Sequence, residues 1–461
     1  MWPTNIAPVS LQGTLEGPAG AHPFCFNAIH SRRALIMRLL IAEPDAEGHH
    51  MVLYTRLLLR EAVSRGWTVT ILTTESGRNH AAFDIISADH AVALRTIVMP
   101  DVIRATSTGS VALLLSQMQL WKALARASSA NNHFSDFDLI YCINLDYFEK
   151  ALSLRGSPFG NRPFAGMLMN PKFHTAPTGL GPPSRGDFLY RIFFKRLLAL
   201  SGLRRLMVID KPFREFCLQQ RFARVEKICL VSDVGELSRS EFVGSARQSL
   251  GLRPDAFVIL LYGSVSRLKG VEQLLRAVQS LNHPEVVALV AGKPDPAIAA
   301  LFSSPWCRAM QESGQLLVRA GFHNDESEAK VFSAADLVWL GYVGGAYGSS
   351  GVLYQAGSAG LPVISMADGL IGWTVKKHKL GISLDTADTS GVVDAIQRLR
   401  HDKLMMQEFG ENGRRLAKCH TGAAFAETIC NALAASISDG DKKGSIVPGT
   451  KRALHSDSRG T

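Results

Sequence analysis

Short apolar runs alternate with amphipathic helical stretches along almost the whole chain. The run MRLLIAEPD, the helical pattern HMVLYTRLLLREAVSRG and the β-branched run WTVTILTTES form one strand–helix–strand unit, and Gly66 stands where that helix should end. Further strands are predicted at ALRTIVMP, FDLIYCIN, FAGMLMNP and RLMVID. Because a helical crossover separates each pair of strands, the pattern predicts a parallel sheet that is covered on both faces.

The same alternation restarts at DAFVILLYGSV and continues through EVVALVAGKPD, LLVRAGFHND, ADLVWLGY, LPVISMAD and GISLDTAD. A chain of 461 residues is long enough for two such sheets, each with its own core. The predicted fold class is therefore α/β, with two Rossmann-like doubly wound domains that face each other across a cleft. The expected boundaries are a disordered extension at 1–36, an amino-terminal domain at 37–232, a carboxyl-terminal domain with a closing helix at 233–437, and a disordered tail at 438–461.

Composition restricts the function classes. No apolar run approaches the roughly 20 residues that a membrane span needs. The seven cysteines are dispersed without metal-ligand spacing, which predicts reduced thiols in a cytoplasmic protein and no metal site. The net charge is +10, and Lys195, Arg196, Arg204 and Arg205 fall close together. A solvated basic helix face explains this cluster better than peripheral docking on an anionic membrane, although both interpretations remain open. Nucleic-acid binding is not expected, because no aromatic side chains that could stack on bases accompany these charges.

The first candidate for anion binding is the stretch AEPDAEGHHMVLY, which leaves a strand, turns at Gly48 and opens a helix. Free backbone amides at a helix N-terminus attract anions, and His49 and His50 are possible donors to a phosphate or a hydroxyl. A capping turn with surface histidines explains the same residues, and the sequence leaves both interpretations open.

The second candidate is LYGSVSRLKGVEQLLRAV, where Gly263 and Gly270 bracket a short loop that carries Arg267 and Lys269. An arginine supplies a fork of hydrogen-bond donors and a lysine supplies a point charge, so this loop suits a diphosphate. The spacing of a Walker loop is absent.

The third candidate is AYGSSGVLYQAGSAGLPVIS, which contains no charged residue. Ser349, Ser350 and Gly351 present amides and hydroxyls at a helix start. Gly357 and Gly360 are expected to let that helix pack closely and to end it before the next strand. A further turn follows in MADGLIGWTVKKHKLG, and glycine-rich turns after successive strands of one sheet predict a ligand rim.

The order of these motifs resembles the GT-B fold glycosyltransferases, especially the large retaining family that uses nucleotide-diphospho-sugars. The resemblance extends over about residues 37–437, and its most specific part is the carboxyl-terminal half, where YGSVSRLKG, GFHNDESEAKVFSAADLVWLGY and AGLPVI fit the pattern. It implies that the carboxyl-terminal domain binds the nucleotide sugar and the amino-terminal domain the acceptor. It also implies that Lys269 neutralises the leaving diphosphate without a metal or other cofactor.

The chain departs from this family at three positions. Two family glutamates, one near the transferred sugar and one at the nucleotide ribose, fall at Tyr347 and Gln355, and the usual arginine after the glycine falls at Ser264. Gln355 retains hydrogen-bonding capacity, whereas Tyr347 cannot replace an anion. The resemblance also suggests His174 as the histidine that follows an amino-terminal strand. Asp146 is a second possibility in that half, although a helix N-cap explains it slightly better.

The predicted function is transfer of a sugar from a nucleotide-diphospho-sugar to a glycan, a lipid-linked acceptor or a small molecule, as in polysaccharide biosynthesis, by a hexosyltransferase-like enzyme. The alternative is a catalytically weak module that binds a nucleotide sugar or glycan and acts beside an active transferase, which the missing glutamates favour. A third reading, an epimerase or phosphorylase, has no motif in its support.

Overall fold

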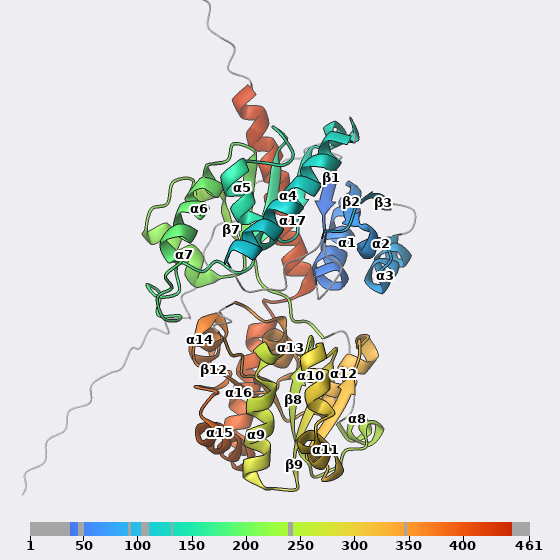
Figure 1. Ribbon diagram of the computed structural model, residues 1–461, viewed down its shortest axis with the longest axis vertical. Coiled ribbons are helices and arrows are strands. Elements are labelled where there is room, and N and C mark those ends of the chain that lie inside the picture. The colour runs from blue at the N-terminus through green and yellow to red at the C-terminus, as the bar shows by residue number, and fades with distance from the viewer. Residues whose placement is uncertain are drawn as a thin grey trace, which may run out of the picture. The chain divides into compact units, whose positions relative to one another are not determined.

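The computed structural model of the chain describes residues 37–44, 50–90, 94–102, 110–130, 132–237, 243–344 and 348–444. It contains two parallel sheets, one of seven strands and one of six, with helices in the crossovers (Figure 1). The α/β class and the two sheets predicted from the alternation of strands and helices are confirmed.

The first sheet has all its strands parallel. In the order in which they lie, they are β3 (Leu94–Met99), β2 (Thr68–Thr74), β1 (Arg38–Ala42), β4 (Leu139–Cys142), β5 (Phe164–Leu168), β6 (Leu203–Val208) and β7 (Ile228–Leu230). The residues of β7 were predicted to belong to the connection between the domains. This strand has only three residues and lies at the sheet edge, so it carries too little periodic pattern to be recognised.

Two apolar clusters cover the faces of this sheet. Leu39 and Ile41 of β1 belong to one cluster, and Leu40 and Ala42 belong to the other, because successive side chains of a strand point to opposite faces. The helical segments in this part are η1 (His50–Thr55), α1 (Arg56–Ser64), α2 (Glu75–Arg78), α3 (Ala81–His90), α4 (Ser110–Ala130), η2 (Asn132–Asp136), η3 (Leu145–Tyr147), α5 (Glu149–Arg155), α6 (Asp187–Ala199), α7 (Lys211–Gln219) and η4 (Val225–Lys227).

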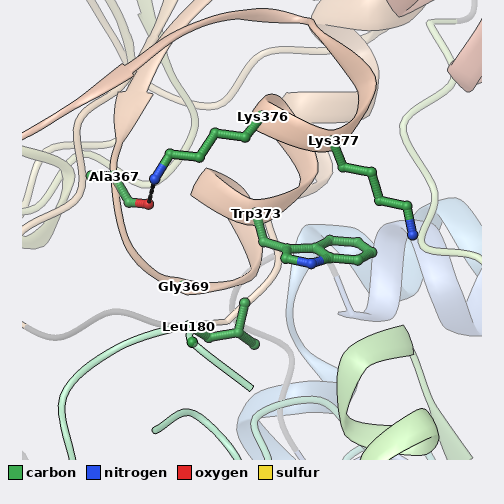
Figure 2. A pocket seen from close by; sticks show the side chains of 7 residues that line it. Leu180, Ala367, Gly369, Trp373, Lys376 and Lys377 are labelled. Carbon is green, nitrogen blue, oxygen red and sulfur yellow. Dashed lines mark hydrogen bonds between the residues drawn. The ribbon is translucent and has the colours of Figure 1, made fainter. Parts of the chain in front are cut away.

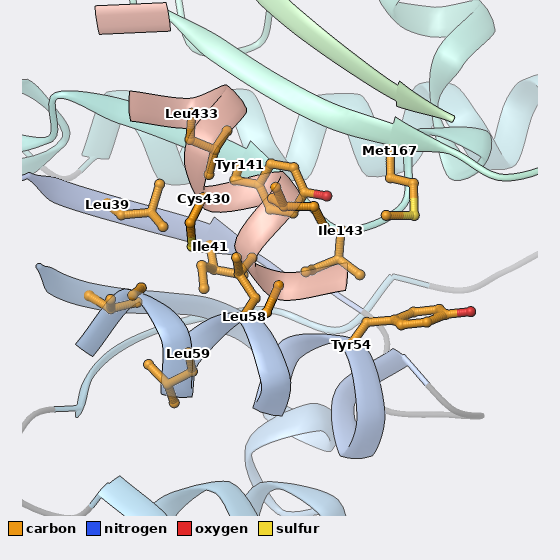
Figure 3. Packing of buried hydrophobic residues seen from close by; sticks show 14 of the residues in the cluster. Leu39, Ile41, Tyr54, Leu58, Leu59, Tyr141, Ile143, Met167, Cys430 and Leu433 are labelled. Carbon is orange, nitrogen blue, oxygen red and sulfur yellow. The ribbon is translucent and has the colours of Figure 1, made fainter. Parts of the chain in front are cut away.

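The last helix, α17 (Gly422–Gly444), packs on the first sheet (Figure 3). Cys430 and Leu433 are buried in the same cluster as Leu39, Ile41 and Tyr141. This helix was predicted to close the second domain, but its apolar residues complete the core of the first. It also continues seven residues beyond the expected start of the tail at 438, and residues 445–461 lie outside the described part of the chain.

The second sheet is again wholly parallel. Its strands lie in the order β10 (Leu316–Ala320), β9 (Val286–Gly292), β8 (Phe257–Tyr262), β11 (Leu337–Leu340), β12 (Val363–Met366) and β13 (Gly381–Leu384). Its helical segments are α8 (Val243–Leu250), η5 (Arg267–Lys269), α9 (Val271–Leu281), α10 (Pro296–Phe302), α11 (Pro305–Glu312), α12 (Asp325–Ala334), α13 (Gly351–Ala359), α14 (Gly369–His378), α15 (Thr389–His401) and α16 (Lys403–Ala417).

Glycines bring α13 against α16, as the third candidate motif predicted. A Cβ atom at Gly357 would lie 2.8 Å from the carbonyl oxygen of Gly413, so the two helices approach backbone to backbone. Gly360 ends α13 in the left-handed conformation with φ of +71°, which glycine adopts without strain. These contacts fix the carboxyl-terminal half of α13 against α16.

The strand order reverses direction between β1 and β4 in the first sheet and between β8 and β11 in the second. In open α/β sheets, ligands bind outside the carboxyl ends of the strands at such a switch point. Among the described residues, no helix combines the length and the apolarity needed to cross a membrane.

Candidate active site

The described residues at the switch point of the second sheet are the loop after β8 and, between β11 and α13, residues 341–344 and 348–350. Gly263 and Gly270 bracket the β8 loop with φ of +98° and +66°, a region that side chains rarely enter. A Cβ at Gly270 would lie 2.0 Å from the carbonyl oxygen of Gly341, which follows β11. The two glycines are therefore required by a tight turn that packs on its neighbour.

Lys269 is the best-positioned cation of this loop. Its ammonium donates to the carbonyl oxygen of Tyr262, and its nitrogen lies 5.8 Å from the ring centroid of Tyr342. Its own carbonyl accepts a 3.0 Å hydrogen bond from the indole of Trp339. Backbone and side chain are thus both fixed, whereas Ser264 and Arg267 in the same loop are exposed to solvent.

The N-terminus of α13 lies next to this loop. The hydroxyls of Tyr342 and Ser350 are 3.0 Å apart, so Tyr342 contacts both Lys269 and the residue that precedes the helix. Within the described residues, no side chain accepts a capping hydrogen bond from the first turn of α13, which begins at Gly351. Uncapped amides at a helix N-terminus carry partial positive charge and favour an anion.

Asp233 orients Ser349 and was not singled out from the sequence. Its carboxylate is 2% exposed and accepts 2.6 Å hydrogen bonds from the hydroxyls of Ser349 and Tyr54. Burial and the nearby Asp233 charge raise the pKa of Tyr54 well above its usual value, so Tyr54 stays a donor. His420 contacts the carbonyl oxygen of Asp233 at 2.8 Å. A lone aspartate in VSDVGE gives no local signal for this arrangement.

Gln355 is paired with a carboxylate. Its side-chain amide donates a 2.7 Å hydrogen bond to Glu328 of α12. Tyr262, at the end of β8, is hydrogen-bonded to the same carboxylate. Burial raises the pKa of Glu328, and the bonds from Tyr262 and Gln355 oppose that effect. A carboxylate is therefore present one contact away from the position where the resemblance places a glutamate.

Three of the residues predicted from the sequence, Gly48, His49 and Tyr347, lie outside the described residues. His174 is described and is 1% exposed. Its Nε2 atom lies 2.9 Å from Oδ2 of Asp210, and its ring lies edge-on to Phe213 with the centroids 5.0 Å apart. Asp210 in turn caps α7 through the amide of Phe213. The catalytic role of His174 stays a prediction, and its burial favours a structural role.

Asp146 lies at the switch point of the first sheet, but it is not a helix N-cap. Asn144 caps η3, while the two carboxylate oxygens of Asp146 accept hydrogen bonds from the amides of Met169 and Asn170, at 2.7 and 2.9 Å. Burial, reinforced by the neighbouring Asp146 charge, raises the pKa of Glu149 to about 8. Burial also raises the pKa of Asp146, against the opposing effect of the amide hydrogen bonds from Met169 and Asn170. Two carboxyl groups with raised pKa values thus follow β4, a combination that is typical of functional sites.

A cavity of about 500 Å³ lies beside the start of α14 (Figure 2). It is lined by Gly179, Leu180, Ala367, Gly369, Trp373, Lys376 and Lys377. Lys377 places its ammonium 4.3 Å from the centroid of the Trp373 ring, and Lys376 donates to the carbonyl of Ala367 at 2.9 Å. The cavity adjoins the last glycine turn that the sequence indicated. Trp373 and Lys377 stand in MADGLIGWTVKKHKLG, but no local pattern there marks either side chain as a lining residue.

The chain is similar to known proteins in sequence and in fold. Residues 244–416 match the family described as glycosyl transferases group 1. A D-inositol 3-phosphate glycosyltransferase of Mycobacterium marinum is 29% identical over 197 residues, which cover 41% of this chain and 40% of that protein. The protein of the same name from a Nocardioides species is 30% identical over 190 residues, covering 38% of this chain and 41% of that protein. The match thus spans about 40% of the length of these relatives.

The fold is shared with solved structures over most of the chain. Sucrose-phosphate synthase from Thermosynechococcus elongatus superposes with a TM-score of 0.63 at 19% identity, covering 87% of this chain and 100% of that chain. The HepE protein of Anabaena, solved in complex with UDP and glucose, gives 0.61 at 16% identity with the same coverage. At such identities the likeness establishes the fold. The resemblance predicted from the motifs is confirmed: the chain has the GT-B fold, and its residues 244–416 match the glycosyl transferases group 1 family.

Proposed function

We propose that the protein is a glycosyltransferase that moves a sugar from a nucleotide-diphospho-sugar to a hydroxyl-bearing acceptor. The observation that carries this proposal is the junction between the β8 loop and α13. There, Tyr342 contacts both Lys269 and Ser350, so a fixed cation shares one switch point with a helix N-terminus that Ser350 does not cap through its side chain. Two positive groups converging at the carboxyl ends of β8 and β11 suit a diphosphate.

Lys269 would neutralise the charge that develops on the departing nucleoside diphosphate, and the first amides of α13 would bind its oxygens. With these groups supplying the positive charge, the transfer is proposed to need no metal, and activity is expected to persist when a chelator is present. HepE of Anabaena was solved with UDP-glucose, so uridine diphosphate sugars are the donors to test first.

The acceptor is proposed to bind in the cavity beside α14. Only Gly179 and Leu180 of its lining come from the amino-terminal half, so this proposal differs from the expectation that the amino-terminal domain alone binds the acceptor. Trp373 offers a flat apolar surface for a sugar or cyclitol ring, and Lys377 offers a charge for an anionic substituent. Relatives named for D-inositol 3-phosphate make a phosphorylated cyclitol the first acceptor to test. A Trp373→Ala variant is expected to raise the KM for the acceptor several-fold with the affinity for the nucleotide unchanged. A parallel loss of nucleotide affinity would contradict this assignment.

A second candidate function is a module that binds the nucleotide sugar without efficient turnover. The observation that favours it is the amide at Gln355, which leaves no carboxylate at that position of α13 and is already hydrogen-bonded to Glu328. Donor binding without release of nucleoside diphosphate, across a panel of donors and acceptors, would support this candidate over the transferase.

Calorimetric titration with UDP, GDP and ADP tests the nucleotide site. One nucleotide should bind saturably to the wild-type chain, and Lys269→Ala should weaken that binding at least about tenfold because it removes a charge-assisted contact. Lys403→Ala is the matched control, since Lys403 is an exposed lysine at the start of α16. If no nucleotide binds, or if both variants behave alike, the proposed site is refuted.

A further inference from the structure

Helix α6 carries apolar side chains on its outer face as well as its inner face. Phe194, Leu197 and Leu198 are buried in the core beneath the first sheet. Phe188, Leu189 and Ile192 point away from that core, with exposed fractions of 73%, 56% and 38%. A surface helix normally presents polar residues to water, so this second apolar face needs an explanation.

The exposed residues form one stripe along the helix. At 100° per residue, Phe188, Ile192 and Lys195 fall within one narrow sector, and Leu189 and Arg196 fall beside it. Lys195 and Arg196 are exposed like the apolar residues before them. The stripe, which we call the α6 face, consists of Phe188, Leu189, Ile192, Lys195 and Arg196.

The net charge of α6 itself is positive. The helix sequence contains Arg191, Lys195 and Arg196 against a single acidic residue, Asp187, which accepts a hydrogen bond from the amide of Ser184. The cationic groups of Arg191 and Lys195 lie 5.4 and 5.7 Å from the ring centroid of Phe222, so their aliphatic stems run along the protein surface.

The four basic residues that lie close together in the sequence do not form one exposed cluster in the structure. Arg204 and Arg205 belong to strand β6 and are half-buried, whereas Lys195 and Arg196 are exposed on α6. The positive charge that remains at the surface is therefore joined to apolar side chains. A solvated basic face alone would not include Phe188 and Leu189.

We propose that the α6 face docks the protein reversibly on an anionic phospholipid surface. Phe188, Leu189 and Ile192 would enter the boundary between headgroups and acyl chains, and Lys195 and Arg196 would remain at the level of the phosphates. An interfacial helix with an apolar face and basic flanks binds membranes through this combination of burial and attraction. The inference goes beyond the proposed function and holds whether or not the chain transfers a sugar.

Co-sedimentation of the full chain with vesicles tests the proposal. Wild type should sediment with vesicles that contain phosphatidylglycerol and stay in solution with pure phosphatidylcholine, and raised salt should weaken the binding. A Phe188→Ser/Ile192→Ser variant and a Lys195→Glu/Arg196→Glu variant should each lose about tenfold or more in vesicle affinity. Leu404→Ser is the matched control, because Leu404 is 79% exposed on α16.

A Phe188→Trp variant gives a direct readout, since its fluorescence should shift to the blue on anionic vesicles. The proposal is overturned if the α6 variants bind vesicles as well as Leu404→Ser does, or if phosphatidylcholine alone binds equally. It is also overturned if light scattering shows a dimer that Phe188→Ser/Ile192→Ser separates, because a second copy would then cover this face. Nucleotide titration of the same variants should be unchanged, which keeps this test separate from that of the nucleotide site.

Discussion

Replacing Gln355 with glutamate is the sharpest test of the site geometry. The amide of Gln355 donates to Glu328 at 2.7 Å, and Tyr262 is hydrogen-bonded to the same carboxylate. Both partners of Glu328 are largely buried, Gln355 at 9% and Tyr262 at 5% exposure. A Gln355→Glu variant would place two carboxylates within contact distance. Such a pair avoids repulsion by sharing one proton.

The expected cost follows from that shared proton. A glutamate has an ordinary pKa of 4.5, so keeping one carboxyl protonated at pH 7 costs up to about 3.4 kcal/mol at about 1.36 kcal/mol per pKa unit. The folded variant binds one more proton than the unfolded chain above the ordinary pKa. Its free energy of unfolding therefore falls as pH rises, and its deficit against wild type should shrink as pH falls toward about 5.

Urea unfolding of the wild type, Gln355→Glu, and the exchange variant Gln355→Glu/Glu328→Gln, at several pH values, measures this deficit. The exchange variant should recover most of the stability at neutral pH, because the amide and the carboxylate have traded places. It is also the variant in which a glutamate at position 355 can be tested for a gain of transferase activity. A single Gln355→Glu variant as stable as wild type at pH 7, with no dependence on pH, would refute the reasoning.

Two further perturbations have outcomes that the structure specifies. Asp233→Asn should lower the free energy of unfolding by about 2 kcal/mol, because the hydroxyls of Tyr54 and Ser349 lose a charged acceptor. If urea unfolding gives the variant and the wild type equal stability, Asp233 does not stabilise the fold through these two hydrogen bonds. Burial raises the pKa of Glu149 to about 8, so between about pH 4.5 and 8 the folded chain retains a proton that the unfolded chain releases. The free energy of unfolding should therefore fall as pH rises through this range. Glu149→Gln should flatten that pH dependence of the unfolding midpoint, and an unchanged slope would show that Glu149 does not contribute to it.

The sequence predicted the features that local patterns encode. Apolar runs of strand length alternating with amphipathic stretches predicted every long strand, and β7 was missed because three residues carry no period. Gly263, Gly270 and Gly360 were recognisable because each occupies a turn in a left-handed conformation. Lys269 was proposed as a site residue for a related reason, since it stands between two such turns at the end of a strand.

The sequence by itself determined the two parallel sheets, the turns at their carboxyl edges and the resemblance to GT-B glycosyltransferases. Only the tertiary structure decided which distant groups meet. Asp233 holds Ser349 across 116 residues of chain, Glu328 reaches Gln355 from another helix, and α17 returns to the first sheet. Likewise, His174 is buried against Asp210, whereas Phe188 is left exposed. Strand and turn patterns arise from neighbouring residues, but hydrogen bonding and burial depend on how separate elements pack, which no local pattern records.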